Sequence, residues 1–531
     1  MAVTDFERAI EQVTAAQRKG AHRRAIELVT LLLNRGPPSG AEAALRLERA
    51  RSFMARDDWA SAENDCRRAL GERHDAAALV LLGECLLAQK RGVEAVEPLE
   101  AAAAQGEASA RWWVLYAQAL SSAARHAEAC AAAERAHERD PHALGTRLRV
   151  LAGAGRHPEV IALARSGVER APDDAELWTW LGLSFDALGH SCDAAPALRR
   201  AVALAPERVD ANCGLAMALL RLGDYGAGFR HNEYRQRDGG RCHRFGVPPW
   251  RGESITDKHV VVHAEQGLGD SVQFSRFLPL VTARARRTTF RAPPPLLRLL
   301  RSNPDFGEVE AGHPGFGSGD LQTLVMSLPV QLGVSENVQI ATVPYVFPEA
   351  ERAERWRTRL PHGPRVALAW QGNPNYAGDP WRSMPFEHFA PLLARHRGRA
   401  TFLSLQKNLG REQLRASPLV DQVIDLADEI DRDGDAFVDS LAVLSQADVL
   451  ITTDNGLAHV AGAAGVRTWL LLGKAPDWRW GLAGADSIWY PSLRLFRQAQ
   501  SGDWDGVVAA VSDALEQLAT RESWRARGGV P

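Results

Sequence analysis

Residues 448–473 read Asp448-Val-Leu-Ile-Thr-Thr-Asp-Asn-Gly-Leu-Ala-His-Val-Ala-Gly-Ala-Ala-Gly-Val-Arg-Thr-Trp-Leu-Leu-Leu-Gly473, and they decide the fold of the C-terminal half. Residues 449–451 are a short, mostly β-branched apolar run, which is typical of a buried parallel strand. The polar residues Thr453, Asp454 and Asn455 then provide N-cap side chains for a helix of small residues over 458–464, which ends at Gly465. Residues 466–472 form a second buried strand.

The turn between the first strand and the helix favours a phosphate group. A helix N-terminus presents unpaired N–H groups and the positive end of the helix dipole. In open α/β sheets, ligands bind beyond the carboxyl ends of the strands, which is where this turn lies. His459 is one turn into the helix, on the face nearest such a ligand. The stretch therefore predicts an α/β domain that holds a phosphorylated ligand.

The bulk composition limits the class of protein. A length of 531 residues predicts two to four domains, and a net charge of −2 gives no general attraction to nucleic acid or to an anionic membrane. No window approaches the ~20 apolar residues of a membrane span, and the N-terminus lacks the apolar core of a signal peptide. All six cysteines lie in the first half without CxxC pairs, so we expect reduced thiols in a soluble, cytoplasmic protein.

An internal repeat fills the first half of the chain. The clearest copy carries small, aromatic and helix-ending residues at fixed offsets. A shift of 34 positions from four of these residues reaches Leu215, Ala216, Leu219 and Gly223. This period and order are the tetratricopeptide signature. We expect about seven helix pairs over residues 6–235, stacked into a right-handed superhelix whose concave groove binds a polypeptide. A passive scaffold or a dimerisation surface is the alternative. The clearest copy contains Trp178, Leu181, Gly182, Phe185, Gly189, Ala194, Leu198, Ala201 and Pro206.

The second half alternates apolar strands with amphipathic helices, which predicts two doubly wound α/β lobes. A Gly, Pro and Arg-rich stretch at 236–257 separates them from the repeats as a linker or a docked strap. Residues 258–350 form the first lobe and 351–531 the second, with a charged helix at 351–360 that can bridge them. The predicted fold class is α + α/β, with an all-α repeat domain at 1–235 and a ligand cleft between two Rossmann-like lobes. The predicted strands span 258–263, 286–291, 321–328, 365–370, 401–405, 423–426, 449–451 and 466–472, with helices from Ser271 and over 293–302.

Gly267-Leu-Gly269-Asp270 follows the first strand of the first lobe. The glycines allow backbone N–H groups to approach a ligand, and Asp270 accepts a proton or, in the alternative interpretation, only caps the helix. The dinucleotide-binding pattern G-x-G-x-x-G is not met, because Val272 occupies the place of the third glycine.

Three segments of the second lobe carry further polar chemistry. Lys407 follows a strand, where it can neutralise a phosphate or, alternatively, lie solvated. Asp431-Arg-Asp-Gly-Asp435 does not match the EF-hand register and predicts an acidic loop without a metal. Ala475-Pro-Asp-Trp-Arg-Trp480 either holds a nucleobase or sugar ring or packs as a lid on the core.

These motifs resemble those of bacterial tetratricopeptide glycosyltransferases, whose catalytic half is similar to the heptosyltransferases and, more distantly, to the O-linked N-acetylglucosamine transferases. The resemblance covers residues ~6–520, with both halves in the expected order. It rests on His263-Ala-Glu-Gln-Gly-Leu-Gly-Asp-Ser-Val-Gln-Phe-Ser-Arg-Phe277, on Asp454-Asn-Gly-Leu-Ala-His459 and on Pro476-Asp-Trp-Arg-Trp480.

The resemblance implies a GT-B fold, a nucleotide-sugar donor as co-substrate and inverting transfer without a bound metal or other cofactor. Asp270 matches the proposed general base, and Asp454, Gly456 and His459 match the donor-binding turn. Lys407 sits where a donor-phosphate lysine is expected, and in the mechanism that follows Lys407 and Arg382 stabilise the departing phosphate. The other residues expected to line the donor site are Gly267, Gly269, Thr453 and Asn455.

Two positions depart from the pattern of these relatives. Asn455 replaces a common Thr or Ser, which removes a hydroxyl that can donate to a phosphate oxygen, and Tyr376 lies where related loops often carry histidine. The resemblance implies that the repeats hold a protein acceptor, with flagellin as the single best guess, and that the cleft glycosylates its Ser or Thr hydroxyls. A surface-polysaccharide glycosyltransferase and an inactive repeat adaptor are the alternatives.

Overall fold

The structure is a computed structural model that describes residues 3–38, 40–72, 75–237, 246–312, 319–336, 342–376 and 378–520. The chain divides into two compact units, Met1–Ser184 and Phe185–Pro531. The predicted domain limits at residues 235, 257 and 350 stay predictions, and all three fall inside the second unit. Cys242, His313 and residues 238–245 of the predicted linker lie outside the described residues.

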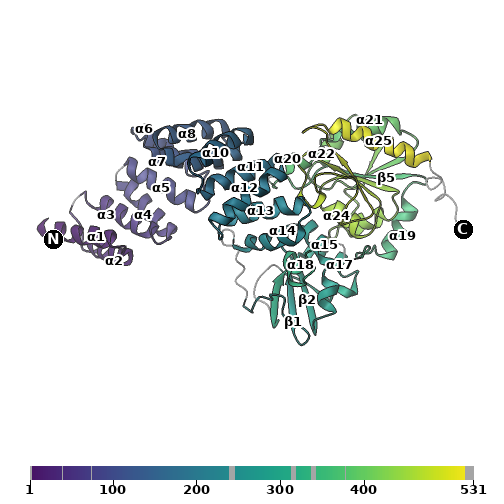
Figure 1. Cartoon of the computed structure of the whole chain (residues 1–531), viewed down its shortest axis with the longest axis horizontal. Helices are drawn as coiled ribbons and strands as arrows, with labels where there is room; N and C mark the ends of the chain where they lie inside the picture. The colour runs from purple at the N-terminus through teal and green to yellow at the C-terminus, as the bar shows by residue number, and fades with distance from the viewer. Residues whose placement is uncertain are drawn as a thin grey trace. The chain divides into compact units, whose positions relative to one another are not determined.

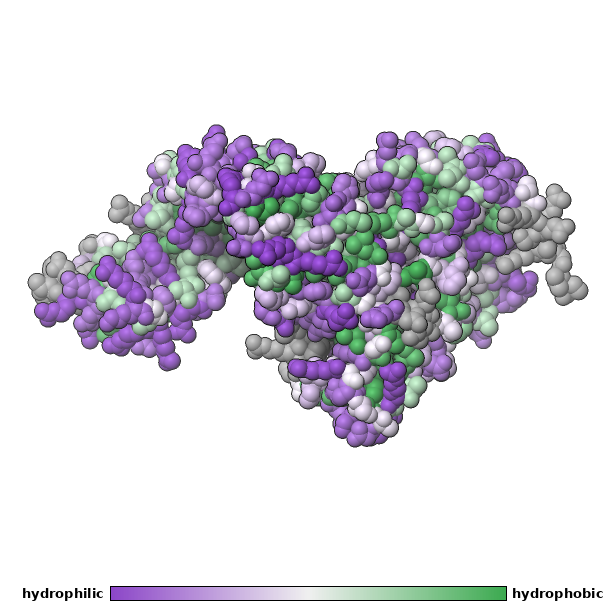
Figure 2. All heavy atoms as spheres, viewed as in Figure 1, coloured by the Kyte–Doolittle hydropathy of each residue, from purple (hydrophilic) through white to green (hydrophobic). Residues whose placement is uncertain are grey.

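Consecutive helices pack against one another throughout the first unit (Figure 1). Small residues make this packing close: a Cβ at Gly83 would lie 2.7 Å from Cγ of Leu99 on the next helix. Ala25, Ala50 and Ala117 are fully buried, whereas hydrophilic side chains predominate on the visible face of the first helices in Figure 2. The helices are α1 (Val3–Arg18), α2 (His22–Asn34), α3 (Glu42–Met54), α4 (Trp59–Glu72), α5 (Ala76–Ala88), α6 (Val96–Ala104), α7 (Ala110–Ser122), α8 (His126–Arg139), α9 (Leu144–Gly153), α10 (His157–Arg170) and α11 (Ala175–Ala187).

The second unit begins with the end of α11 and continues with α12 (Ser191–Leu204), α13 (Val209–Arg221) and α14 (Tyr225–Asn232). Helices α1 to α14 make seven consecutive pairs, so the predicted helical repeats are confirmed. A short 3₁₀ helix, η2 (Glu233–Arg237), leads out of the last pair.

A parallel four-stranded sheet forms the first α/β lobe, with strand order β3-β2-β1-β4. The order reverses between β1 and β4, and this switch point is where open α/β sheets bind ligands. The backbone of residues 246–250 adds to the sheet beside β4, since Trp250 N–H donates to the carbonyl of Gln322 at 2.8 Å. That part of the predicted linker is therefore a docked strap. The elements are β1 (His259–His263), α15 (Leu268–Ser275), α16 (Leu278–Thr282), β2 (Arg287–Ala292), α17 (Leu297–Leu300), β3 (Glu308–Ala311), β4 (Leu321–Leu324) and α18 (Leu328–Gln331).

Several element limits in this lobe differ from the sequence prediction, and one strand was missed. Helix α15 begins at Leu268 rather than Ser271, because Asp270 lies in its first turn and accepts the N–H of Gly267 at 2.8 Å. Strand β4 ends at Leu324, since the chain turns into a 3₁₀ helix at Val325. Strand β3 was missed because it is a charged edge strand with a single buried residue, Val309.

A parallel six-stranded sheet forms the second lobe, with order β10-β9-β8-β5-β6-β7. Renumbered within the lobe, this is the 3-2-1-4-5-6 order of the Rossmann fold, and its switch point lies between β5 and β8. Helices α21 and α25 pack together on one face of the sheet (Figure 1). The elements are α19 (Ala350–Arg359), β5 (Arg365–Ala369), α20 (Asp379–Arg382), α21 (Ala390–Arg395), β6 (Thr401–Ser404), α22 (Arg411–Ala416), β7 (Val423–Asp425), α23 (Val438–Leu444), β8 (Val449–Thr453), α24 (Gly456–Ala463), β9 (Thr468–Leu472), β10 (Leu493–Arg497) and α25 (Trp504–Thr520).

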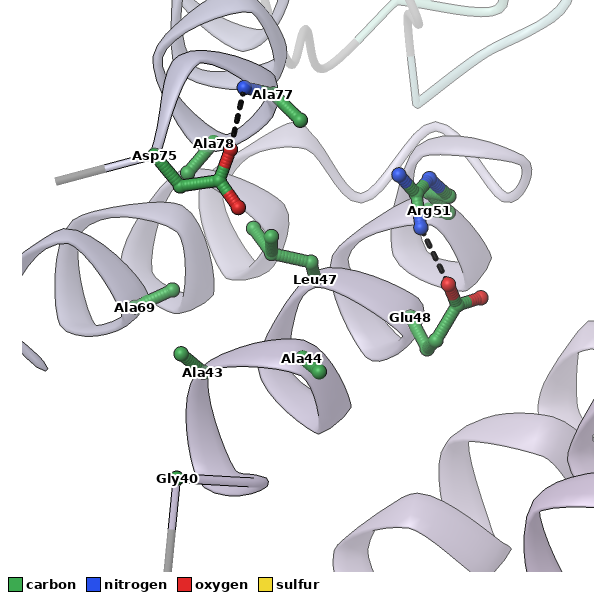
Figure 3. Close-up of a pocket in the computed structure, with 10 residues that line it drawn as sticks. All are labelled: Gly40, Ala43, Ala44, Leu47, Glu48, Arg51, Ala69, Asp75, Ala77 and Ala78. Carbon is green, nitrogen blue, oxygen red and sulfur yellow. Dashed lines mark hydrogen bonds and ion pairs between the residues drawn. The ribbon is translucent and has the colours of Figure 1, made fainter. Parts of the chain in front are cut away.

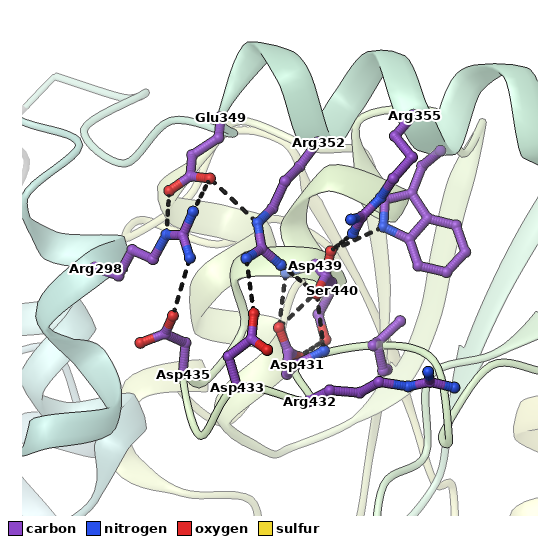
Figure 4. A network of polar contacts seen from close by, with 12 residues as sticks. Arg298, Glu349, Arg352, Arg355, Asp431, Arg432, Asp433, Asp435, Asp439 and Ser440 are labelled. Carbon is purple, nitrogen blue, oxygen red and sulfur yellow. Dashed lines mark hydrogen bonds and ion pairs between the residues drawn. The ribbon is translucent and has the colours of Figure 1, made fainter.

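An ion-pair network joins the two lobes (Figure 4). Arg298 of α17 pairs with Glu349 before α19 and, at 3.3 Å, with Asp435 of the second lobe. Arg352 of α19 pairs with Asp433 at 3.1 Å, so carboxylates of the predicted acidic loop are bound to arginines. The charged helix predicted to bridge the lobes therefore does so.

A second, buried contact joins the lobes closer to the sheets. Arg276, at the end of α15, donates to the carbonyl of Trp489 at 2.9 Å and lies over the ring of Tyr490. Among the helices described by the structure, none is both long and apolar enough to cross a membrane.

Candidate active site

The N-termini of α15 and α24 meet between the two lobes, and glycine makes this approach possible. A Cβ at Gly269 would lie 2.8 Å from Cδ2 of His459 and 3.4 Å from the Cα of Gly456. Each helix follows the strand at the switch point of its sheet, so both predicted glycine turns are brought to one place. The space opposite Gly269 is filled by the His459 ring, and therefore this glycine serves helix packing.

Asp270 is held by one contact to each of its carboxylate oxygens. Oδ2 accepts the N–H of Gly267 at 2.8 Å, and Oδ1 forms an ion pair with Nη2 of Arg479 from the opposite lobe. Burial raises the pKa of Asp270, while Arg479 and the Gly267 N–H act to lower it. Asp270 thus caps the helix N-terminus, and its role as a proton acceptor stays a prediction.

Arg479 belongs to a loop over residues 474–481, here named the Trp-Arg-Trp loop, which follows β9 and contains the 3₁₀ helix η9 (Trp478–Trp480). Its guanidinium pairs with Asp477 at 2.9 Å and donates through Nε to Oε1 of Gln273 on α15. Only 8% of Arg479 is exposed. A buried arginine between two carboxylates from different lobes holds the lobes together.

The two tryptophans of this loop are packed rather than open to a ligand. Trp478 is edge-on to Phe229 at 5.8 Å and also contacts Phe274, and Trp480 stacks on His459 at 5.5 Å. Both indoles are 3% exposed. Of the two interpretations of this segment, the structure favours the packed lid, because the ring faces are already covered.

Asp454 lies at the end of β8 and is 7% exposed. Burial raises its pKa to about 6, with a further contribution from the nearby charge of Asp477, while Trp480, Arg382 and Arg479 act to lower it. The site therefore contains several carboxylates near two arginines, and Asp454 changes charge close to neutral pH.

Arg382 occupies the rim of this cluster. Its guanidinium pairs with Asp379 at 3.1 Å and lies over the ring of Tyr376 at 4.6 Å. Tyr376 is half exposed. Its pKa is raised, first by burial and then by the nearby charges of Asp477 and Asp454. Tyr376 thus faces the same charges as Asp454.

His459 is buried, and its surroundings disfavour the charged form of its ring. Its pKa is well below the ordinary value because of burial, with further lowering by Arg479, Arg276 and Arg382. Nδ1 lies 3.0 Å from the hydroxyl of Tyr490, which fixes the ring together with the stack on Trp480. A neutral imidazole held in this way acts as a hydrogen-bonding group rather than as a cation.

Asn455 is the N-cap residue of α24, as predicted for this turn. Its Oδ1 accepts the N–H of Leu457 at 3.0 Å, and its Nδ2 donates to Oγ1 of Thr452 at 3.0 Å. Asn455 is therefore committed to the turn, whereas the buried Oγ1 of Thr453 has no hydrogen-bond partner within the described part of the chain. Thr453 keeps a hydroxyl for a ligand, and the donor-binding role of both residues stays a prediction.

The ammonium group of Lys407 is bound by backbone carbonyls rather than by a carboxylate or by solvent alone. Its Nζ donates to the backbone carbonyls of Ile430 and Asp431, the former at 2.9 Å. The side chain of Asp431 in turn caps α23 by accepting the N–H of Asp439 at 2.7 Å. In this conformation Lys407 supports the acidic loop, and its contact with a donor phosphate stays a prediction.

Sequence reasoning did not place Arg479, Asp477 or Gln273 in the site. The first two lie in a segment singled out for its aromatic residues, and the arginine between two tryptophans was the available signal. Gln273 gave no signal, because one glutamine on an amphipathic helix does not differ from a surface residue. It is fully buried, and its Nε2 has no hydrogen-bond partner among the residues described by the structure.

The repeats and the two sheets together define the fold class. The chain joins tetratricopeptide repeats to two facing Rossmann-like lobes, an arrangement known as the GT-B fold. A tetratricopeptide repeat family model matches residues 47–110 and 182–229.

The chain is similar to Protein FlbA of Caulobacter vibrioides, with 24% identity over 433 residues that cover 68% of this chain and 71% of the relative. It is also similar to two solved structures, each 14% identical. A glycosyl transferase family 9 protein from Veillonella parvula covers 50% of this chain and 99% of its own, with a TM-score of 0.39. The ADP-heptose lps heptosyltransferase II of E. coli covers 50% and 99%, with a TM-score of 0.37.

Proposed function

We propose that this protein is an inverting glycosyltransferase that moves a sugar from a nucleotide-sugar donor to Ser or Thr hydroxyls of a protein acceptor. One observation carries the proposal: the two helix N-termini that follow the switch-point strands meet at Asp270, Arg479 and His459. This arrangement offers a proton acceptor on one lobe and positive charge for a phosphate on the other.

Asp270 is the general base of the proposed reaction. The acceptor hydroxyl gives its proton to a carboxylate oxygen of Asp270 while its own oxygen attacks the anomeric carbon of the sugar. The bond from that carbon to the phosphate oxygen breaks, its electron pair leaves with the nucleotide, and the configuration at carbon inverts. Burial raises the pKa of Asp270, which makes its carboxylate a stronger proton acceptor than a solvated one.

Positive groups on the second lobe stabilise the departing nucleotide. Arg479 and Arg382 are fixed guanidinium groups, and the N-terminus of α24 presents backbone N–H groups with the dipole of the helix. Preorganised cations and N–H groups perform the charge stabilisation that a metal ion supplies in other transferases, and we propose that transfer needs no metal.

The repeats are the proposed site for the acceptor polypeptide. A hollow of about 190 Å³ lies between α3 and α5, lined by alanines together with Glu48, Arg51 and Asp75 (Figure 3). Glu48 and Arg51 pair with each other, and one oxygen of Asp75 caps α5 by accepting the N–H of Ala77 at 2.9 Å. Small side chains beside polar groups suit an extended peptide, whose backbone needs hydrogen-bond partners.

Flagellin is the acceptor that we propose first, and the cytoplasm is the proposed compartment. The thiols of Cys66 and Cys85 are buried next to each other without a disulfide, which is typical of a reducing environment.

Two experiments test the proposal. A thermal-shift screen with UDP, CMP, ADP and GDP identifies the donor nucleotide, because a selective ligand raises the unfolding temperature by mass action. Intact-mass analysis of flagellin co-expressed with the protein then reports transfer as a fixed sugar increment. Asp270→Ala removes the increment if Asp270 is the base, and Asp257→Asn, at an exposed position just before β1, is the matched control.

The possible outcomes distinguish the proposed function from its alternatives. Near-normal turnover by Asp270→Ala removes Asp270 as the base. An increment on a glycan acceptor but on no protein supports surface-polysaccharide synthesis instead. No increment on any acceptor, together with intact protein binding by the repeats, supports the repeat adaptor.

A further inference from the structure

The Trp-Arg-Trp loop is held by the last helical repeats as well as by the two lobes. Arg221, the final residue of α13, donates from Nε to the carbonyl of Pro476 at 3.1 Å. The same guanidinium pairs through Nη1 with Asp186 and donates to Oγ of Ser191 at 3.2 Å. Arg221 and Asp186 are mostly buried, at 11% and 13% side-chain exposure, so the guanidinium has one orientation and its remaining edge points at the loop.

Van der Waals contacts on both sides of Pro476 support this hydrogen bond. A Cβ at Gly189, in the turn between α11 and α12, would lie 3.4 Å from Cβ of Ala475. Further along the loop, Trp478 packs edge-on against Phe229 of α14 at 5.8 Å. The loop backbone therefore follows the surface of the last repeats over residues 475–478.

The opposite side of the same loop reaches the candidate active site. Three residues beyond Pro476, Arg479 forms the ion pair with Asp270 and the hydrogen bond with Gln273. Trp480 stacks on His459 at 5.5 Å. A shift of the Pro476 carbonyl would move Arg479 away from Asp270, because only two residues and a 3₁₀ turn separate them.

We propose that Arg221 is a positioning residue for sugar transfer: by holding the Pro476 carbonyl from the last repeats, it places Arg479 against Asp270. This inference rests on the proposed role of Asp270 as the base. It gives α13 a role in positioning the reacting groups, in addition to the acceptor binding proposed for the repeats. Lysine cannot take over this role, because one ammonium group cannot match the planar fork that joins Asp186, Ser191 and Pro476.

The test compares Arg221→Lys with Arg208→Lys in the full-length protein. Arg208 lies just before α13 and pairs with Asp210, so the control makes the same substitution at the other end of the helix. We expect Arg221→Lys to lower kcat by roughly ten- to hundredfold with little change in donor KM, since displaced reacting groups lose rate rather than binding. The acid limb of its pH–rate profile is expected to move to higher pH, as in a variant that lacks the Arg479 guanidinium. Hydrogen exchange of the amides of residues 474–481 is expected to become faster, and Arg208→Lys to match the wild type in all three measurements.

The outcomes that overturn the inference are distinct. Wild-type kcat and pH profile in Arg221→Lys refute the positioning role, and so does a lower kcat without a shift of the acid limb, which indicates general destabilisation. Unchanged exchange at residues 474–481 shows that Arg221 does not hold the loop. If the wild-type protein transfers no sugar to any acceptor, the proposed function is wrong, and the exchange measurement alone still decides whether Arg221 fixes the loop.

Discussion

The ring of His459 occupies the space that a side chain at Gly269 would need, with Cδ2 only 2.8 Å from the position of a Cβ there. This contact lies where a helix of the first lobe meets a helix of the second. It means that two motifs almost 200 residues apart in the sequence are one packing unit, because neither helix can move without disturbing the imidazole.

Gly269→Ala is expected to disrupt this unit. The added methyl group forces His459 or α15 to move, and overpacking of this kind costs about 1–3 kcal/mol. We expect a lower unfolding temperature and weaker nucleotide binding, measured by thermal unfolding with and without the best nucleotide. Gly71→Ala on α4 is the control, since a Cβ there meets no atom within 4 Å. Wild-type stability and affinity in Gly269→Ala would show that the two helices adjust without cost.

Arg479→Gln is expected to change the pH dependence of transfer. Arg479 lowers the pKa of Asp270, which burial alone raises, so removal of the guanidinium raises that pKa further. The base is then protonated at higher pH, and the acid limb of kcat/KM moves upward.

Loss of one partner of a buried ion pair also lowers the stability of the fold by about 3–5 kcal/mol. Arg479→Lys is therefore measured as well, because it keeps a positive charge and should shift the acid limb less. The exposed Arg467 provides the control Arg467→Gln. If the acid limb does not shift in Arg479→Gln, Asp270 is not the group whose ionisation limits the rate.

Asp454→Asn is expected to stabilise the protein at alkaline pH. The pKa of Asp454 is about 6 in the folded state and 3.8 ordinarily, so the wild-type protein gains stability as the pH falls through about 6 and loses it as the pH rises. Above pH 7 the amide avoids this penalty, which amounts to up to about 3 kcal/mol, and the difference vanishes below pH 4. Urea unfolding from pH 4 to 8 measures it, with Asp513→Asn on the exposed face of α25 as control. A difference that is constant with pH would contradict the raised pKa.

His459→Ala is expected to weaken nucleotide binding by about tenfold, the effect of one lost hydrogen bond. Isothermal titration with the nucleotide selected in the thermal-shift screen measures it, and His388→Ala on the surface is the control. Affinity equal to that of the wild type would remove His459 from the donor site.

Chelation is expected to leave transfer intact. Dialysis against EDTA followed by the transfer assay should give the untreated rate, because guanidinium and backbone N–H groups carry the charge stabilisation in the proposed reaction. Activity lost on chelation and restored by Mg²⁺ or Mn²⁺ would establish a metal requirement.

The parts of the fold that follow from local periodicity were predictable from the sequence. The 34-residue spacing predicted the helix pairs, and short apolar runs ending in polar turns predicted the strands β5 and β8 close to their limits. Strand β3 was not predictable, because its charged sequence forms an edge and carries no apolar run.

The residues of the candidate site also divide into those that the sequence predicted and those that it did not. Asp270 and His459 stand in turns with a recognisable strand-turn-helix pattern, and the structure brings the two helix N-termini into contact. The pairing of Arg479 with Asp270 joins positions more than 200 residues apart, and no spacing rule reports such a contact. Nor could sequence reveal that Asn455 is fully occupied in capping α24, since a capping asparagine and a ligand-binding asparagine have the same neighbours in the chain.

The position of Arg221 has a consequence for engineering. Because α13 holds the Trp-Arg-Trp loop from the side of the repeats, α12 to α14 must stay with the catalytic half in any chimera. Foreign repeats are therefore to be joined near Ser184, where the first compact unit ends, and under the proposed function such an exchange changes the acceptor while Arg221 and the Trp-Arg-Trp loop stay in place.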